Sequence, residues 1–145
     1  MAVERLLAAF SVLIVVVEVW SVVRGYSFLP QWCGWIGLVL TALGVVFFTA
    51  AVLQMRDSWR AGISSDEKTG LVTSGIYSVS RNPAFVGFDL TYIGLLLCFA
   101  NWLHLIVVLC TVTIFHLQIL QEERFLLSRK DIDYKNYYNR VRRYL

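Results

Sequence analysis

Four apolar runs separated by polar segments are the feature that most constrains the fold of this chain. They cover approximately residues 6–23, 34–55, 83–100 and 102–120. Because roughly 20 apolar residues in a helix cross the hydrocarbon core of a bilayer, we expect each run to be a transmembrane helix. The composition agrees: 58% of the 145 residues are hydrophobic and 16% are charged, whereas about 25% are charged in a typical soluble domain. The sequence therefore predicts an all-α integral membrane protein whose residues 1–145 form a single domain.

The boundaries of the runs refine this prediction. The first run is longer than the apolar part of a signal peptide and has no convincing small-x-small cleavage site before Arg24, so we expect it to be a span. Pro83 suits the first turn of a helix, where its missing N–H leaves no bond unmade, and it marks the start of the third span. Asn101 is a tight polar break between the third and fourth runs. We therefore expect these two spans to form an antiparallel helical hairpin.

The distribution of basic residues predicts the orientation in the membrane. With four spans, both termini and the polar connection between spans two and three lie on one side. Of the 13 Lys and Arg residues, only Arg24 falls on the opposite side. The positive-inside rule then places the termini and the polar connection in the cytoplasm.

The last part of the chain is polar and basic, with a regular pattern of apolar residues. Its aromatic and apolar residues recur at spacings of three and four, as in Tyr134, Tyr137, Tyr138, Val141 and Tyr144. This spacing is typical of an amphipathic helix with aromatic residues on one face. We expect such a helix over about residues 131–144, lying on the cytoplasmic surface of the membrane. A solvated terminal helix is the alternative.

Several kinds of site are not indicated by the sequence. It contains no GxGxxG, Walker, GxSxG or HExxH motif, and His104 and His116 are too far apart for a helical metal pair, so no metal site is predicted. Cys98 and Cys110 lie inside apolar runs, where thiols pack as small hydrophobic groups. The basic residues flank the predicted spans, which makes membrane lipids rather than nucleic acid the expected partners.

Polar residues at the cytoplasmic ends of the third and fourth spans are candidates for one site. Ionisable residues within a membrane are costly, so each is a functional candidate. Arg81 and Asn82 precede the third span, Asp89 lies about two turns into it, and Glu122 and Glu123 follow the fourth span. Because the third span starts on the side where the fourth ends, we expect these residues to converge at one depth.

Four motifs in sequence carry a resemblance to a known family. They are Gly-x-Tyr at residues 75–77, Arg-Asn-Pro-Ala-Phe-Val-Gly at 81–87, Glu-Glu-x-x-Leu at 122–126, and Tyr-x-x-Tyr-x-x-x-Val at 134–141. In order and spacing they resemble the isoprenylcysteine carboxyl methyltransferase and phospholipid methyltransferase superfamily of integral membrane enzymes. The chain departs from the family pattern in that Asn82 stands where the family has His, Phe85 stands where it has Tyr, and the Gly expected before Tyr134 is absent. Asn still supplies a hydrogen-bond donor and an acceptor.

The resemblance implies methyl transfer from S-adenosyl-L-methionine, bound without a Rossmann fold between the start of the third span and the end of the fourth. The implied catalytic residues are Arg81, Asp89 and Glu123. An amine acceptor would need a proton acceptor, for which Asp89 or Glu123 is suited. The implied cofactor-binding residues are Leu71, Val72, Gly75, Tyr77, Arg81, Asn82, Pro83, Phe85, Gly87, Glu122 and Glu123.

The methyl acceptor and some alternatives stay open at the level of sequence. A prenylcysteine-type carboxylate, a lipid amine, or a small lipophilic acid or thiol entering from the bilayer is each compatible with the chain. Small residues in the second span, such as Gly34, Gly37 and Gly44, are compatible with a homodimer or with packing inside one chain. The alternatives to a methyltransferase are an NADPH-dependent membrane reductase of related topology and a non-catalytic membrane scaffold.

Overall fold

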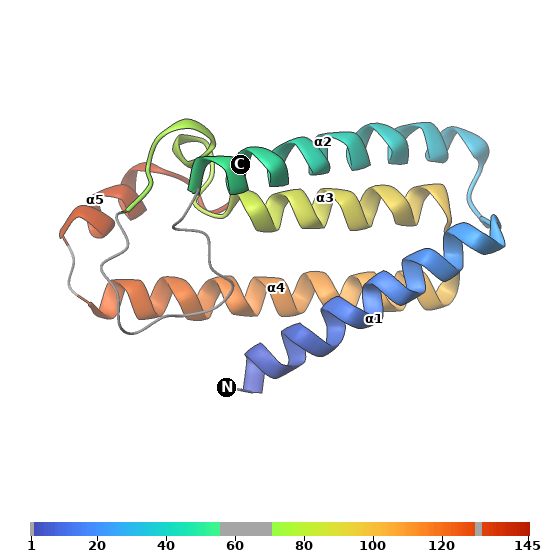
Figure 1. Ribbon diagram of the computed structural model, residues 1–145, viewed down its shortest axis with the longest axis horizontal. Coiled ribbons are helices and arrows are strands. Elements are labelled where there is room, and N and C mark those ends of the chain that lie inside the picture. Colours follow the sequence, from blue (N-terminus) through green and yellow to red (C-terminus); the bar gives the residue numbers. More distant parts are fainter. Residues whose placement is uncertain (1, 56–70, 130–131) are drawn as a thin grey trace.

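The computed structural model describes residues 2–55, 71–129 and 132–145, and over these residues it is helical with no strand. Figure 1 shows the arrangement of its elements. They are α1 (Ala2–Arg24), α2 (Gln31–Met55), the short 3₁₀ helix η2 (Gly75–Ser78), α3 (Pro83–Cys98), α4 (Trp102–Ser128) and α5 (Ile132–Arg140). The all-α prediction is confirmed for the described part of the chain.

Three of these helices are long and apolar enough to cross a membrane. The qualifying stretches are Arg5–Arg24, Gln31–Met55 and Trp102–Ser128, which makes the chain a multi-pass membrane protein. Helix α3 is also apolar but has 16 residues, a length of about 24 Å at 1.5 Å per residue. That is shorter than the ~30 Å hydrocarbon core, so a complete fourth span stays a prediction.

Helices α2 and α3 lie side by side and approach closely through glycine (Figure 1). A Cβ atom added to Gly87 would lie 2.6 Å from the backbone nitrogen of Phe48, and one added to Gly94 would lie 2.6 Å from the carbonyl oxygen of Gly37. Such contacts allow two backbones to touch where lipid offers no hydrophobic drive for helix association. Gly37 and Gly44 of α2 therefore pack against α3 of the same chain, and the homodimer stays a prediction.

The two helices of the predicted hairpin run antiparallel, but each packs mainly against another helix. Helix α4 packs chiefly on α1, and α3 packs chiefly on α2. Aromatic rings provide contact between α3 and α4, with the centroid of Phe115 5.3 Å from that of Phe85. Asn101 ends the connection between them, because its side chain accepts a 2.9 Å hydrogen bond from the backbone N–H of His104 and caps α4.

Two helix ends near the C-terminus differ from the ends of the predicted elements. Helix α4 continues to Ser128, eight residues beyond the predicted end of the fourth span at 120, so Glu122 and Glu123 lie on the helix. Helix α5 ends at Arg140 rather than at 144, and residues 141–145 form a separate segment, called here the C-terminal segment.

The aromatic face of α5 packs against the protein. Tyr134, Tyr137 and Val141 are buried together, and the Tyr137 hydroxyl donates a 2.7 Å hydrogen bond to the carbonyl oxygen of Tyr77. Their burial corrects the prediction that this face lies on the membrane surface. The physical reason is that a tyrosine buried in protein satisfies its hydroxyl with a backbone carbonyl while its ring stays in apolar contact.

Candidate functional site

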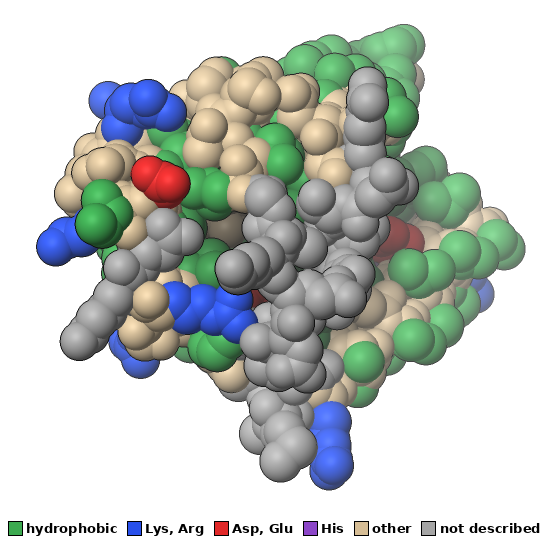
Figure 2. Space-filling view, turned by 60° about the vertical axis from the view of Figure 1, so that its left-hand side comes forward, with side chains coloured by type: hydrophobic (Ala, Val, Ile, Leu, Met, Phe, Trp, Pro, Cys, Tyr) green, Lys and Arg blue, Asp and Glu red, His purple; other side chains and the backbone are tan. Residues whose placement is uncertain are grey.

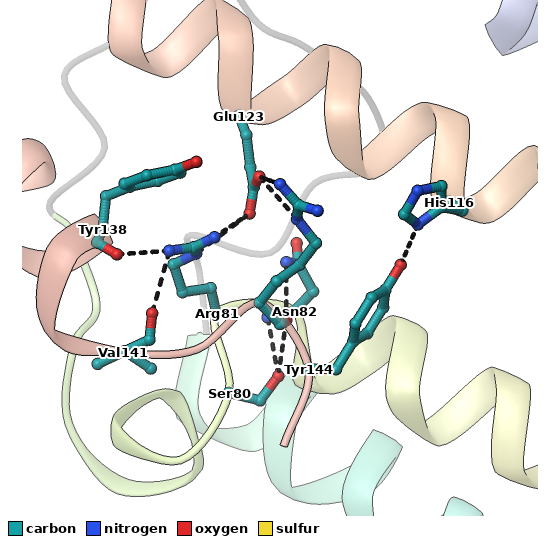
Figure 3. Close-up of polar contacts among 9 residues, drawn as sticks. Ser80, Arg81, Asn82, His116, Glu123, Tyr138, Val141 and Tyr144 are labelled. Atoms are coloured by element: carbon teal, nitrogen blue, oxygen red, sulfur yellow. Dashed lines mark hydrogen bonds and ion pairs between the residues drawn. The ribbon is translucent and has the colours of Figure 1, made fainter.

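A buried arginine lies at the centre of the candidate site. Arg81, between η2 and α3, donates from Nε and Nη2 to Glu123 Oε1, at 3.1 and 2.8 Å (Figure 3). Its Nη1 donates to the carbonyl oxygens of Tyr138 and Val141. The guanidinium carbon also lies 3.9 Å from the centroid of the Tyr138 ring, which is a cation–π contact. These contacts leave the buried charge of Arg81 paired and hydrogen-bonded.

Glu123 uses both of its carboxylate oxygens in ion pairs. Oε1 accepts from Arg81, and Oε2 accepts from Nε and Nη2 of Arg143 at 2.9 and 2.8 Å. The hydrogen bond to Glu123 raises the pKa of Arg143 above its usual value. The Glu123 side chain is 6% exposed, whereas that of Arg143 is 31% exposed. Glu123 therefore joins α4 to the segment before α3 and to the C-terminal segment at once.

The residues before α3 also hold the backbone of the C-terminal segment. The Arg81 N–H donates to the carbonyl oxygen of Arg142 at 2.9 Å. The Asn82 side-chain amide donates to the carbonyl oxygen of Arg143 at 3.1 Å, and the Ser80 hydroxyl donates to the same oxygen at 3.3 Å. Asn82 thus binds the C-terminal segment rather than capping α3, for which its side chain makes no hydrogen bond. Pro83, the next residue, is buried as the first residue of α3.

Tyr144 brings the C-terminal segment to α4. Its hydroxyl is hydrogen-bonded to Nδ1 of His116, and the two rings are stacked with centroids 6.0 Å apart (Figure 3). Burial raises the pKa of Tyr144, and the carboxylate of Asp89 raises it further. Asp89 of α3 therefore acts electrostatically on the same region as Tyr144 and His116.

Asp89 is not part of the Arg81–Glu123 ion pair. Its Oδ1 is buried and has no hydrogen-bond partner among the residues that the structure describes. The predicted convergence is therefore partly observed: Arg81 and Glu123 touch, and Asn82 shares the C-terminal segment with them. Asp89 reaches that segment through electrostatic interaction with Tyr144.

Glu122, the neighbour of Glu123, has a different partner. Its Oε1 accepts a 2.8 Å hydrogen bond from Nε2 of Gln118, one helical turn earlier. The two adjacent glutamates point in different directions because successive residues on a helix are rotated by about 100°. Glu123 faces the arginines, and Glu122 faces Gln118.

The remaining predicted cofactor-binding residues are distributed over three places. Tyr77 is buried with Ala51 and Ala84, and Val72 packs against that cluster. Phe85 packs against the larger cluster around Phe115 and Tyr92. Burial raises the pKa of Tyr77 to about 12.

Both predicted glycines make close contacts with α2. Gly75 has a φ of +59°, a left-handed conformation that glycine adopts without strain, and a Cβ atom there would meet the side chain of Gln54. Gly87 meets the α2 backbone, as described above. Leu71 lies elsewhere, on a groove of about 470 Å³ lined also by Thr73, Asp133, Asn136, Tyr137 and Arg140.

Figure 2 looks toward the end of the molecule that carries α5. Lys and Arg side chains gather on this face, and hydrophobic side chains cover the parts that extend away from it.

Sequence reasoning missed Gln118, His116, Arg143 and Tyr144 as members of the site. The spacing of Gln118 and Glu122, four residues apart on a helix, is the one local signal that could have linked any of them to the site. The described residues include no group of three or more His, Cys, Asp or Glu side chains that could hold a metal ion.

Comparisons with known proteins bear on the same segments. The sequence model of a family described as phospholipid methyltransferase matches residues 32–130, which is more than half of the chain. The chain is also similar to protein-S-isoprenylcysteine O-methyltransferase of Saccharomyces cerevisiae, with 29% identity over 119 residues. The alignment covers 80% of this chain and 50% of the yeast protein, so the chain spans about half the length of that relative. No solved structure matches the chain.

Proposed function

Because the chain belongs to the phospholipid methyltransferase family, we propose that it transfers a methyl group from S-adenosylmethionine to a lipophilic acceptor at the cytoplasmic boundary of the membrane. The family consists of membrane methyltransferases that use this cofactor. The multi-pass helical architecture is consistent with a lipophilic acceptor that enters from the bilayer.

The observation that carries the proposal is the joining of three sequence motifs by one ion pair. Arg81 belongs to the 81–87 motif, Glu123 to the 122–126 motif, and the Tyr138 and Val141 carbonyls to the C-terminal motif. These segments lie far apart in the sequence, and Arg81 contacts all of them. Three motifs that fold together at one end of the helices support a shared site, in which this ion pair would hold the segments in position.

The residues present fit the chemistry of the cofactor. S-adenosylmethionine carries two positive groups, a sulfonium and an ammonium, and the buried, unpartnered Oδ1 of Asp89 is suited to a cation. Glu122 offers a carboxylate for an ammonium or hydroxyl donor. The groove along Leu71 and Tyr137 is not lined by Asp89 or Glu122, so it is a separate candidate for small-molecule contact. Its lining includes Asp133, Asn136 and Arg140, which supply charged and polar contacts.

When bound, the cofactor supplies an electrophilic methyl group on sulfur. The chain has to hold the acceptor in line with that group and to exclude water, so orientation would provide most of the rate. We assign Arg81 and Glu123 to positioning, since their polar atoms bond to each other, to Arg143 and to backbone carbonyls. Asp89 is the proton acceptor for an amine substrate, whereas a carboxylate or thiolate needs none.

We propose the class of methyl acceptor from the chemistry that the site allows. The yeast relative is named for O-methylation of a protein S-isoprenylcysteine. For this chain, a prenylcysteine-type carboxylate, a lipid amine, and a small lipophilic acid or thiol are the acceptor classes we propose to test. The placement of Lys and Arg supports a site on the cytoplasmic side.

A titration of the detergent-purified protein with S-adenosylhomocysteine tests the proposal, with NADPH as the comparison ligand. We expect saturable heat with S-adenosylhomocysteine and none with NADPH. Glu122→Gln should weaken the binding by about 10-fold or more, as for a lost hydrogen bond to a charged group. A thermal melt of the variant checks that it is folded. Binding of NADPH alone would favour a reductase, and binding of neither ligand would favour a scaffold.

A further inference from the structure

The two adjacent glutamates of α4 differ in the partners that the structure gives them. Both oxygens of Glu123 are engaged by Arg81 and Arg143, in ion pairs of 2.8 Å. A ligand that bound Glu123 would have to displace the buried guanidinium of Arg81, whose side chain is 8% exposed. Breaking such a buried pair is strongly unfavourable. Glu123 is therefore poorly placed to bind a ligand directly.

Gln118 lies one helical turn before Glu122 and is oriented by it. The Gln118 amide donates from Nε2 to Glu122 Oε1 at 2.8 Å. The opposite orientation of the amide would place its oxygen against the carboxylate oxygen, which repels it. The donation to Glu122 therefore identifies which end of the amide is the oxygen.

The oxygen of that amide is a buried acceptor without a donor. Gln118 is 1% exposed, and its Oε1 has no hydrogen-bond partner among the described residues. Most buried polar atoms in folded proteins are paired, so an orphan of this kind calls for an explanation. A bound molecule with an N–H or O–H group would complete it.

Resting on the proposed function, we propose that Gln118 and Glu122 bind a hydrogen-bond donor of the cofactor, its ammonium or a ribose hydroxyl, while Glu123 holds the C-terminal segment in place. Gln118 contributes a neutral acceptor that burial keeps away from water, and Glu122 both orients it and adds negative charge. The two residues lie at i and i+4 of one helix, so a single donor group can reach both.

Gln118→Met and Gln121→Met form a matched pair for the test. Both change the same side chain on the same helix, but Gln121 is partly exposed. Methionine has nearly the volume of glutamine and no strong acceptor. The binding constants of wild type and both variants are measured by titration with S-adenosylhomocysteine and with 5′-methylthioadenosine, which lacks the amino acid part. The melting temperature without ligand is recorded for each.

We expect Gln118→Met to weaken binding of S-adenosylhomocysteine by about 10-fold, the loss of one hydrogen bond to a charged or strongly polar donor. Its unliganded melting temperature should stay close to that of the wild type, because removing an unpaired buried acceptor offsets the lost hydrogen bond to Glu122. Gln121→Met should bind like the wild type. If 5′-methylthioadenosine keeps its affinity, the donor is the ammonium; if both ligands lose affinity, the donor is on the nucleoside.

Two results would overturn the inference: affinity of Gln118→Met within twofold of the wild type, or the same loss in Gln121→Met. If Gln118→Met does not fold, Gln118→Asn, which keeps the amide but withdraws it by one methylene, must show the loss. A wild type that binds no S-adenosylhomocysteine would refute the proposed function and this inference with it. Normal binding by both Gln118 variants would refute this inference alone.

Discussion

Arg81 and Glu123 form an ion pair with Nη2 and Oε1 2.8 Å apart, although they are 42 positions apart in the sequence. Their side chains are 8% and 6% exposed. A buried pair of this kind is stable only if its remaining donors and acceptors are satisfied. Here the carbonyls of Tyr138 and Val141 and the guanidinium of Arg143 satisfy them.

Glu123→Gln is expected to destabilise the protein by about 3 kcal/mol, because Arg81 would stay buried without a counter-charge. The measurement is chemical unfolding in detergent, followed by tryptophan fluorescence. Glu122→Gln makes the same chemical change at the next residue, which bonds to Gln118 instead, and should lose less than ~1.5 kcal/mol. Equal losses in the two variants would remove the special role of Glu123.

Arg81→Met and Glu123→Met should show strong coupling in a double-mutant cycle. Each single change leaves the other charge buried without its partner, whereas the double change removes both charges. The free energy of unfolding lost in the double variant should therefore be at least ~1 kcal/mol smaller than the sum of the losses in the two single variants. Arg143, with 31% exposure, can be hydrated when Glu123 is removed. Arg124→Met, at an exposed position of α4, should add independently to Glu123→Met. Additive losses for the Arg81 pair would contradict the prediction.

Features set by local sequence were predictable, and those set by long-range bonds were not. The apolar runs and Pro83 locate the helices, because hydrophobic length and the missing N–H of proline act within one element. The fold of residues 141–145 depends on donors from Arg81 and Asn82 that bond to the carbonyls of Arg142 and Arg143. No local pattern encodes those bonds.

The different partners of Glu122 and Glu123 were equally hidden from the sequence. Both are glutamates at the end of one apolar run, and the sequence predicted both to bind the cofactor. Helical rotation of about 100° per residue separates their directions, and the positions of Arg81 and Arg143 in the fold decide that Glu123 is the one that pairs with them. Helix α4 extends beyond the predicted end of the span at 120 because polar residues end the apolar run without ending the helix.

Close packing of α2 and α3 is tested by Gly94→Ala with Gly34→Ala as its control. A Cβ atom at Gly94 would lie 2.6 Å from the carbonyl oxygen of Gly37, whereas nothing lies within 4 Å of one at Gly34. We expect Gly94→Ala to lower the free energy of unfolding by about 1–3 kcal/mol through overpacking. Gly34→Ala should be neutral or slightly stabilising, since alanine favours a helix by up to about 1 kcal/mol. The melting temperatures of the two variants are measured in the same detergent. A melting temperature of Gly94→Ala at or above that of Gly34→Ala would contradict the close packing of α2 and α3.

The buried tyrosines predict a loss of stability at alkaline pH. Burial raises the pKa of Tyr137 from 10.0 to about 12 despite the opposing effects of Arg81 and Arg140, and burial chiefly raises the pKa of Tyr134 and Tyr77 to about 12. Between pH 10 and 12 the unfolded chain has lost these phenol protons while the folded chain keeps them. The folded state then binds more protons, so the free energy of unfolding falls as pH rises through this window.

Tyr137→Phe should reduce the slope of that alkaline loss. At pH 7 the same change should destabilise the protein by about 1–2 kcal/mol, since the hydroxyl that donates to the Tyr77 carbonyl is lost. Tyr26→Phe, at an exposed tyrosine, serves as the control and should change neither quantity. Unfolding curves from pH 8 to 12 give both readings. A Tyr137→Phe slope equal to that of the wild type would show that Tyr137 does not take part in the alkaline transition.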